Sequence, residues 1–427
     1  MKNPRYIRVF FLTSILCIAA LLAAAFLPQS RIAENISRSL PGLVNEGTYP
    51  RLKEGYRSAM LDNYTDSLTL MEVLSMQGED LSTVFSNPLY LQKEDPMESL
   101  VNYAENPDLL PDGYYVRYWM GFRASLRLLF SFLTYSQIRR LNFLVLVCLA
   151  GFSMLSVAKK VNNASALGLG LCLLLMRPLI IARSFQYTTC FLIALAAMPF
   201  VPLIRRRKAC FGLFFMVVGM LTQFFDFYSV PVLTLCLPLL FHFAIQVASR
   251  ERERERELRE LATASLSWMG GYVLFWLEKL LLSTVFSPIN GFSNGFAEFL
   301  YWMNRHPASG GNKLLYVYRR VWNVVCPSLY ASLVLGSFAV VLAIYAFVAI
   351  RRGMLSAKHL WNNGIAGTML LPLIWMGVAA TPTGNHAFFQ YRSIAAVFWG
   401  LCLLVTASAD APRFKGFLSS KKNGKIN

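Results

Sequence analysis

Long apolar runs separated by short polar or basic connections dominate the chain. Ten of these runs approach the roughly 20 residues that a helix needs to cross the hydrocarbon core of a bilayer. They lie near residues 9–27, 141–158, 163–180, 185–203, 209–226, 229–247, 262–284, 328–350, 364–381 and 393–409. The pattern predicts an all-α polytopic membrane protein with about ten transmembrane helices. A mainly helical extracytoplasmic loop lobe is expected between the first and second spans.

This pattern divides the chain into four expected parts. They are an N-terminal transmembrane anchor at 1–27, an extracytoplasmic loop with amphipathic or interfacial helices at 28–136, a multi-span transmembrane domain at 137–410, and a basic cytoplasmic tail at 411–427. The first run has the basic start of a signal peptide, but no small-x-small cleavage site precedes Pro28 and further spans follow. We therefore interpret this run as an uncleaved anchor.

Composition supports a membrane location and argues against a nucleic-acid partner. Of the 427 residues, 56% are hydrophobic and only 15% are charged, and the mean hydropathy is +0.45. The net charge of +18 is unevenly distributed, because residues 28–122 hold 14 of the 23 acidic residues and only 7 of the 41 basic ones. In membrane proteins, Lys and Arg accumulate in short cytoplasmic loops. The asymmetry is therefore an orientation signal.

The basic connections alternate consistently with ten spans when both termini are cytoplasmic. These connections are Lys159-Lys160, residues 205–208, residues 250–260, Arg351-Arg352 and Lys421-Lys422. The long acidic loop and the turns near 181–185, 226–229 and 382–392 then face outward, as does the loop at 287–326. We expect a multi-pass protein of a bacterial inner (plasma) membrane, in contact with the lipid bilayer.

The first candidate site is the acidic stretch from Asp62 to Ser67. If it is helical, Asp62 and Asp66 share one face at i, i+4. Either carboxylate would suit the general base for an acceptor hydroxyl, with Tyr64 beside it as a substrate contact. The alternative is that the pair only caps a helix and interacts with its dipole.

The second candidate comprises Arg117, Tyr118 and Arg123, just before an apolar segment at 119–135 that is too short to cross a bilayer comfortably. Planar guanidinium groups bind phosphate well, so a lipid phosphate arriving from the bilayer would meet these residues early. Interfacial arginine and aromatic residues also commonly anchor a helix at the headgroup level without binding a substrate.

The remaining candidates come from three expected outer turns. Arg183 and Gln186 form a polar turn between two spans, and Asp226 ends its span among aromatic residues. These groups would bind substrate or phosphate, or satisfy backbone groups of the turn. His386, with Tyr391 and Arg392, would bind sugar hydroxyls or phosphate, although a lone histidine in a turn is more often structural.

Several kinds of chemistry lack a sequence signal. No Walker A motif, GxSxG, HExxH or dinucleotide fingerprint occurs. The eight cysteines lie almost entirely inside apolar runs and read as small buried residues. No cofactor and no metal ligand set is predicted, and a divalent metal requirement is left open.

The layout resembles the GT-C-type membrane glycosyltransferases, in which a first span, a sizeable outer loop with an acidic motif and many further spans follow one another. The resemblance rests on this topology and on Asp62 and Asp66. It implies transfer of a sugar from a polyprenyl-phosphate-linked donor to a cell-envelope glycan or lipid acceptor at the outer face. Under this resemblance the phosphate contacts would be Arg117, Arg123, Arg183 and Arg392. The pair is more widely spaced, and farther behind the first span, than in that family.

Three other functions remain open on the sequence. A transporter or flippase of an anionic or lipid-linked solute would use the same arginines, but it needs polar residues through both halves of the membrane. A cell-envelope polymer polymerase or ligase also acts outside on lipid diphosphates. A non-catalytic scaffold would use the acidic loop as a binding platform.

Overall fold

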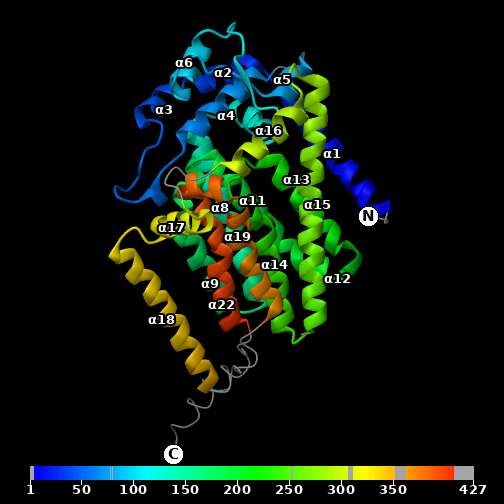
Figure 1. Ribbon diagram of the computed structural model, residues 1–427, viewed down its shortest axis with the longest axis vertical. Helices are drawn as coiled ribbons and strands as arrows, with labels where there is room; N and C mark the ends of the chain where they lie inside the picture. Colours follow the sequence, from blue (N-terminus) through cyan, green and yellow to red (C-terminus); the bar gives the residue numbers. More distant parts are fainter. Residues whose placement is uncertain are drawn as a thin grey trace, which may run out of the picture.

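The computed structural model describes residues 4–76, 78, 80–251, 253–305, 311–351 and 362–407. The chain is almost entirely helical: a bundle of apolar helices carries a cap of shorter helices at one end (Figure 1). Within the described residues, the only sheet has two short antiparallel strands, with Pro88 opposite Tyr114. The predicted all-α class is therefore confirmed, whereas the basic tail expected at 411–427 lies outside the described residues.

The cap, defined as residues 28–134, consists of short elements. They are α2 (Gln29–Ser37), α3 (Leu40–Glu46), η1 (Arg57–Ala59), α4 (Asn63–Ser75), α5 (Leu81–Ser86), β1 (Pro88–Leu89), α6 (Pro96–Glu105), β2 (Gly113–Tyr114) and α7 (Phe122–Phe130). Helix α4 is buried along nearly its whole length. It therefore forms the centre of the cap, between the outer helices and the bundle.

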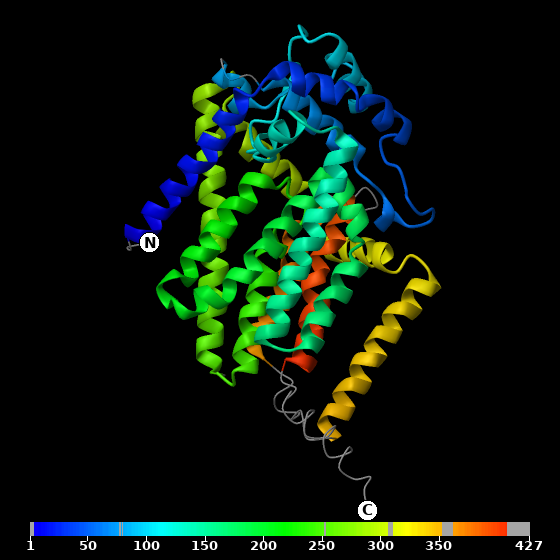
Figure 2. The ribbon, with the colours of Figure 1, turned by 180° about the vertical axis from the view of Figure 1, so that it is seen from behind.

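The remaining elements form the bundle and its connections. They are α1 (Pro4–Ala25), α8 (Tyr135–Lys160), α9 (Asn163–Leu175), α10 (Pro178–Arg183), α11 (Phe185–Ala197), η2 (Met198–Phe200), α12 (Val201–Arg206), η3 (Lys208–Cys210), α13 (Phe211–Phe225), α14 (Val232–Ala248), α15 (Arg254–Phe286), α16 (Gly291–Asn304), α17 (Lys313–Val325), α18 (Leu329–Arg351), α19 (Asn363–Val378), α20 (Ala380–Asn385), α21 (Ala387–Gln390), η5 (Tyr391–Ile394) and α22 (Ala395–Thr406). Helix α17 lies crosswise to the bundle, and α18 runs obliquely beside it (Figures 1 and 2).

Six helical segments of the described chain are long and apolar enough to cross a membrane. They are Pro4–Ala25, Tyr135–Lys160, Phe185–Arg206, Arg254–Phe286, Leu329–Arg351 and Ala387–Thr406. Four of the other predicted spans correspond to shorter apolar helices, namely α9, α13, α14 and α19. The chain is thus a helical membrane protein by these criteria, while the number of ten spans stays a prediction.

A buried arginine fastens the cap to the first helix. Arg127 of α7 donates to the carbonyls of Ala24, Ala25 and Leu27 at the end of α1, and to the carbonyl of Val73 in α4. The last carbonyls of a helix lack partners within the helix. The guanidinium supplies donors to these groups, so the buried Arg127 joins α1, α4 and α7.

Two glycines allow α13 and α15 to approach closely. A Cβ atom on Gly219 would lie 2.1 Å from the carbonyl oxygen of Trp268, and one on Gly271 would lie 2.2 Å from that of Met216. Contacts this short are impossible without separating the helices. Small residues serve the same purpose in many membrane helix pairs.

Replacing Gly271 by alanine should therefore destabilise the bundle by about 1–3 kcal/mol, the usual cost of overpacking. Thermal unfolding of the purified protein in detergent measures the effect. Gly270→Ala is the matched control, because a Cβ at Gly270 meets nothing within 4 Å. Equal melting temperatures for the two variants would contradict the close approach of α13 and α15.

Candidate functional site

A short hairpin links the outer part of the cap to α4. Arg51 and Met60 form an antiparallel bridge, the Leu52 N–H donates to the Ala59 carbonyl at 3.0 Å, and the Leu61 N–H donates to the Pro50 carbonyl at 2.9 Å. We call residues 50–62 the hairpin. In Figure 1 it descends from the cap towards α17.

Three polar contacts fix the second arm of the hairpin to the bundle. The Asp62 N–H donates to Ser184 Oγ at 3.1 Å, the Tyr187 hydroxyl donates to the Met60 carbonyl at 3.4 Å, and Arg392 Nη2 donates to the Ser58 carbonyl at 3.2 Å. The three bundle residues come from α11, its N-cap and the segment before α22. The hairpin therefore has a defined position relative to helices that are distant in sequence.

Arg392 is committed to the protein interior. Only 1% of it is exposed, and its other two hydrogen bonds go to the carbonyls of Met176 and Phe388. Its guanidinium also lies over the Tyr187 and Tyr391 rings, at 4.6 and 4.9 Å from their centroids. The structure gives Arg392 a positioning role behind the hairpin, which differs from the direct phosphate contact that the sequence suggested.

Asp62 caps α4 and is nearly buried. Its carboxylate accepts hydrogen bonds from the Thr65 N–H at 3.1 Å and the Thr65 hydroxyl at 2.9 Å. Burial raises the pKa of Asp62 to about 6, although the hydrogen bonds from Thr65 oppose this shift. Capping, the structural explanation left open by the sequence, is thus present. The same environment also gives the carboxyl group a pKa suitable for proton transfer near neutral pH.

Asp66 lies one turn farther along α4 in a different environment. It is fully buried, and it accepts hydrogen bonds from the Phe185 N–H at 3.0 Å and the Tyr135 hydroxyl at 2.5 Å. Arg139 Nη2 lies 3.9 Å from its carboxylate. Burial raises the pKa of Asp66 to about 7, and Arg139 and Tyr135 oppose this shift. These contacts of the Asp66 side chain all join α4 to α8 or α11. Asp66 therefore helps to hold the three helices together.

Arg139 should be the most stabilising charged residue of this junction. It pairs with Glu46 at 2.7 Å and donates to Asn63 Oδ1 at 2.8 Å, besides its approach to Asp66. Arg139→Leu removes the cation that faces the buried Asp66 and pairs with the partly exposed Glu46, and breaking a buried pair costs about 3–5 kcal/mol.

Thermal unfolding in detergent tests this expectation, with Arg38→Leu as the control. Arg38 forms an exposed i, i+4 pair with Glu34 at 2.6 Å, and such pairs contribute about 0–1 kcal/mol. Similar losses of stability for the two variants would show that the Arg139 network does not hold the cap to the bundle.

Aromatic rings surround Asp62 on the side of the hairpin. Tyr49 stacks on Tyr64 with centroids 5.9 Å apart, and it meets Phe388 edge-on at 6.1 Å. The side chains of Tyr49 and Tyr64 are 44% and 36% exposed. The pKa of Tyr49 is raised by burial and, next in importance, by the Asp62 charge. An exposed aromatic surface therefore adjoins the buried carboxyl group.

A cluster of cations without acidic partners lies along the same hairpin. The cationic cluster, as we call it, comprises Arg51, Lys53, Arg57, Arg177 and Arg320. Burial lowers the pKa of Arg57, and repulsion from Arg320 and Arg51 lowers it further. Within the part of the chain that the structure describes, none of these five has a carboxylate within 4.0 Å. Like charges held together without counter-charges form a site for an anion.

Tyr56 organises part of this cluster. The ammonium of Lys53 lies 4.4 Å and the guanidinium of Arg177 lies 5.2 Å from the centroid of the Tyr56 ring. Arg177 also adopts a left-handed backbone conformation with φ of 60°. This conformation costs a residue other than glycine about 1–3 kcal/mol and is frequent at functional sites. Arg320 comes from the crosswise helix α17, where its Nε donates to the Gly384 carbonyl at 3.5 Å.

Other residues expected from the sequence have partners elsewhere. Arg123 is fully buried and donates to the carbonyls of Met120, Thr83 and Val84. Arg117 lies between the rings of Tyr115 and Tyr118, and it approaches Glu298 to 3.5 Å and Asn294 to 3.5 Å. Neither arginine belongs to the cationic cluster, so we do not include them or Tyr118 in the candidate site.

Asp226 also has a local structural role. Its carboxylate accepts hydrogen bonds from the N–H and hydroxyl of Ser229, and from the Thr189 hydroxyl at 3.5 Å. These contacts close the turn between α13 and α14.

The last four expected residues are Gln186, Tyr391, Arg183 and His386, whose polar side chains are not fully paired with the described residues. Buried oxygen atoms of Gln186 and Tyr391 have no hydrogen-bond partner among the described residues. Arg183 is half-buried and forms no ion pair with the described residues. His386 stacks on Phe389 at 5.4 Å, and burial lowers its pKa, which keeps the imidazole neutral at pH 7. These groups stay candidates for substrate contacts.

The sequence reasoning missed the cationic cluster, although a signal was present. The acidic segment 28–122 contains only seven basic residues, and three of them, Arg51, Lys53 and Arg57, fall within one stretch of seven positions. In addition, Arg319-Arg320 interrupts a loop predicted to face outward, where basic residues are disfavoured. The local excess of basic residues in these two segments was the sequence signal that could have indicated an anion-binding site.

Neither a metal-ligand set nor a match to a known protein identifies the site. In the described ranges, no group of three or more His, Cys, Asp or Glu side chains is placed to hold a metal ion. No family model, curated protein or solved structure matches the chain. The geometry of the hairpin is therefore the feature from which a function can be inferred.

Proposed function

We propose that this protein is a GT-C-like membrane glycosyltransferase. It takes a sugar from a polyprenyl-phosphate-linked donor and transfers it to a cell-envelope acceptor at the outer face of an inner membrane. One observation carries the proposal: a single hairpin bears Arg51 and Arg57, which have no carboxylate partner among the described residues, and ends at the buried acid Asp62. To act on a phosphate-linked sugar, the cations that bind the phosphate and the acid that accepts the proton must lie within the length of one sugar phosphate.

The cationic cluster supplies the electrostatic half of this chemistry. As the glycosidic bond breaks, negative charge develops on the phosphate of the leaving group. Guanidinium groups already held in place stabilise that charge without reorganising, and such preorganised electrostatic stabilisation is commonly the largest catalytic effect. Arg57 and Arg320 approach from the hairpin and from α17, so the phosphate binds between two segments that are far apart in sequence.

Asp62 supplies the acid–base half. An acceptor hydroxyl oxygen attacks the anomeric carbon, and its proton moves to the Asp62 carboxylate. The bond between the anomeric carbon and the phosphate oxygen breaks, and its electron pair leaves with the polyprenyl phosphate. The pKa of about 6 leaves Asp62 mostly ionised at pH 7 while keeping it basic enough to accept the proton.

The aromatic surface suits the sugar itself. Tyr49 and Tyr64 present exposed rings next to Asp62. Rings with a polar hydroxyl combine an apolar face with a hydrogen-bonding tip, which matches the mixed surface of a sugar. The donor phosphate would then lie towards Arg57 and the acceptor towards Asp62.

A second candidate function follows from the size of the cationic cluster. Five cations exceed the charge of one phosphate group, so the site also suits a lipid diphosphate. A polymer polymerase or ligase of the cell envelope uses such donors. Comparing polyprenyl-phosphate and polyprenyl-diphosphate sugars as donors for the purified protein separates the two functions.

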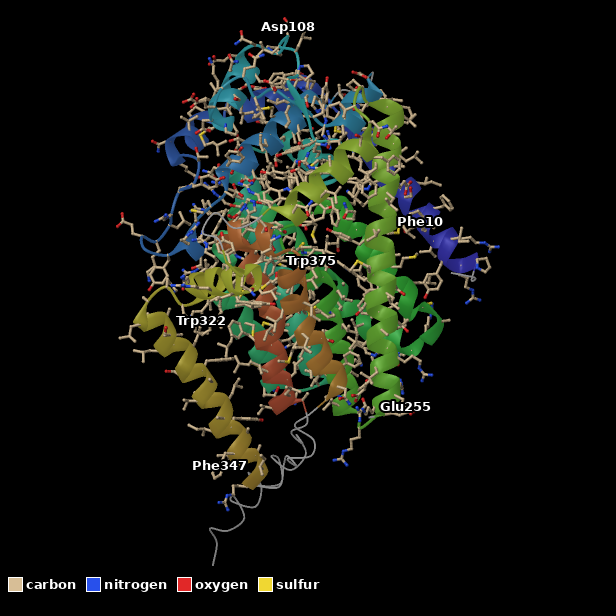
Figure 3. The ribbon with its side chains drawn as sticks, viewed as in Figure 1. Phe10, Asp108, Glu255, Trp322, Phe347 and Trp375 are labelled. Carbon is tan, nitrogen blue, oxygen red and sulfur yellow. The ribbon has the colours of Figure 1, made fainter. Side chains whose placement is uncertain are left out.

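Asp62→Asn should lower sugar transfer by about 10²–10⁴-fold, the usual contribution of a general base. In the unsubstituted protein, transfer should fall as pH decreases through about 6, because protonated Asp62 cannot accept a proton. Transfer of a labelled sugar in reconstituted vesicles measures both effects. Asp108→Asn is the control, since Asp108 lies at the far tip of the cap (Figure 3). Normal transfer by Asp62→Asn would remove Asp62 from the base role.

Arg57→Gln and Arg320→Gln should each raise the KM for the donor about tenfold and lower kcat, because each removes one charge from the phosphate site. A charge-assisted hydrogen bond contributes about 1.5–3 kcal/mol. Arg319→Gln is the matched control on α17, where Arg319 is exposed beside Arg320. An equal loss in all three variants would indicate a general charge effect, and unchanged kinetics in Arg57→Gln would exclude the cluster from donor binding.

A further inference from the structure

Three glutamines have unpaired carbonyl oxygens near the turn between α13 and α14. They are Gln186 at the start of α11, Gln223 near the end of α13 and Gln390 at the end of α21. Only 8%, 2% and 4% of these residues are exposed, and the Oε1 atom of each has no hydrogen-bond partner among the described residues. A buried acceptor without a partner is costly. The three oxygens are therefore available to the hydrogen-bond donors of a ligand.

Tyr228 lies at the centre of these side chains. Its carbonyl accepts a hydrogen bond from Gln390 Nε2 at 2.8 Å, and its side chain hydrogen-bonds with that of Gln223. The backbone of Tyr228 is left-handed, with φ of 58°. This conformation is unfavourable for a residue other than glycine and is frequent at functional sites.

Gln186 approaches the same turn from α11. It lies one helical turn before Cys190, so the two side chains share a face of the helix. Cys190 Sγ accepts a hydrogen bond from Ser229 Oγ at 3.6 Å, which places this face against the turn. Gln186 also lies two residues after Ser184, whose Oγ binds the Asp62 N–H. The glutamines are therefore close to the segment that holds the proposed base.

Aromatic rings complete the surroundings of the glutamines. The Tyr228 ring lies 5.4 Å from that of Tyr118 and 6.1 Å from that of Tyr272. Trp375, which is labelled in Figure 3, lies with its ring 6.3 Å from that of Tyr272. Tyr118 and Tyr228 are half-buried, so their rings are accessible in part. We call the three tyrosines and the three glutamines the Tyr228 cluster.

The charges beside Tyr118 and Tyr228 are paired within the protein. The Asp226 carboxylate accepts hydrogen bonds from the N–H and hydroxyl of Ser229. The Arg117 guanidinium lies 5.0 Å from the centroid of the Tyr118 ring and 3.5 Å from Glu298. However, Arg117 Nε is buried and has no hydrogen-bond partner among the described residues. The cluster thus adjoins one unpaired donor in addition to its three unpaired acceptors.

The charges at the start of α11 are also balanced. Asp66 accepts a hydrogen bond from the Phe185 N–H and lies 3.9 Å from Arg139 Nη2. Asp62 and Arg392 contribute one charge of each sign on this side. No excess of either sign therefore favours an ionic ligand near Gln186.

The mixture of unpaired donors and acceptors selects a class of ligand. An ammonium group has only donors, so it would leave Arg117 Nε unpaired, and an ionised phosphate has only acceptors, so it would leave the glutamine oxygens unpaired. A hydroxyl group both donates and accepts. A sugar residue carries several hydroxyls together with an apolar C–H face, and tyrosine rings combine an apolar face with a polar tip.

We propose that the Tyr228 cluster binds an uncharged sugar residue, whose hydroxyls donate to the glutamine oxygens and whose C–H face packs on the tyrosine rings. The cluster shares no residue with the cationic cluster. One part of the inference rests on the proposed function: if the protein is a transferase, this sugar residue belongs to the acceptor. The acceptor is then a glycan, which enters beside Asp62 through the start of α11.

Saturation-transfer difference NMR tests the site without measuring sugar transfer. The protein is reconstituted in phosphatidylcholine nanodiscs, and only its aromatic protons are irradiated, because this lipid has none. The probes are the methyl glycosides of glucose, galactose, mannose and N-acetylglucosamine, with empty nanodiscs as the blank. We expect saturation of the ring C–H protons of at least one glycoside. Excess cyclohexylammonium or inorganic phosphate should leave this signal unchanged.

Glutamine variants make the result specific. Gln186→Met should lower the affinity for the glycoside about threefold to tenfold, which corresponds to one neutral hydrogen bond. Its melting temperature in detergent should not fall, because Gln186 Oε1 has no partner in the described chain. Gln246→Met is the matched control. Gln246 is also buried with an unpaired Oε1, but it lies beside Glu260 near the far end of α14, and its variant should keep the affinity.

Four results would each overturn the proposal. They are saturation of none of the glycosides, displacement of the glycoside by cyclohexylammonium or phosphate, unchanged affinity in Gln186→Met, and an equal loss of affinity in Gln246→Met. A lower melting temperature of Gln186→Met would assign this side chain to the fold and would also overturn it.

The result is distinguishable from a failure of the proposed function. A protein that binds a methyl glycoside in the Tyr228 cluster but transfers no sugar in any assay keeps the saccharide site and loses the glycosyltransferase assignment. A protein that transfers sugar but whose glycoside binding is insensitive to Gln186→Met keeps the enzyme and loses this site.

Discussion

The attachment of residues 58–62 to the end of the bundle is the constraint on which the candidate site depends. Ser184, Tyr187 and Arg392 each bind a backbone group of this short arm. Side-chain contacts could shift by rotamer changes, but hydrogen bonds to the backbone fix the path of the chain itself. The positions of Arg57 before the arm and Asp62 at its end follow from that fixed path.

Buried arginines perform the same physical task at other junctions. Arg123, Arg127 and Arg392 all direct their guanidinium groups to backbone carbonyls at the ends of helices or in turns. Where water is excluded, an unpaired carbonyl is costly, and one guanidinium has five donors in a fixed geometry. Arg127 and Arg392 therefore join the cap to the bundle, and Arg123 joins segments within the cap. The less buried arginines are left available for an anion.

The sequence predicted the architecture better than the site. Apolar periodicity and length identify helices directly, so the helical class, the helix from Asn63 and the short helix of the 119–135 segment were predictable. A sequence cannot tell which arginine is buried against carbonyls, because the partners of Arg123 and Arg392 come from segments far along the chain. For the same reason Asp62 and Asp66, which looked like a pair, lie in different environments.

The missed residues illustrate the complementary limit. Arg320 joins Arg57 only because α17 lies crosswise next to the hairpin, and no local pattern encodes that approach. The segment 287–326 was expected only as an outer loop between spans, yet it contains α16 and α17. In α16 the aromatic and apolar residues outweigh the turn-forming Gly291, Asn294 and Gly295, which lie within its first turns.

The proposed function requires that a lipid-linked sugar bind with its phosphate on the hairpin. The most direct measurement is a cryo-electron microscopy structure of the full chain in nanodiscs with a short-chain polyprenyl-phosphate sugar. We predict density for the phosphate between Arg57 and Arg320, with the sugar next to Tyr49 and Asp62. Phosphate density at another position, with the cationic cluster unchanged and unoccupied, would contradict the account.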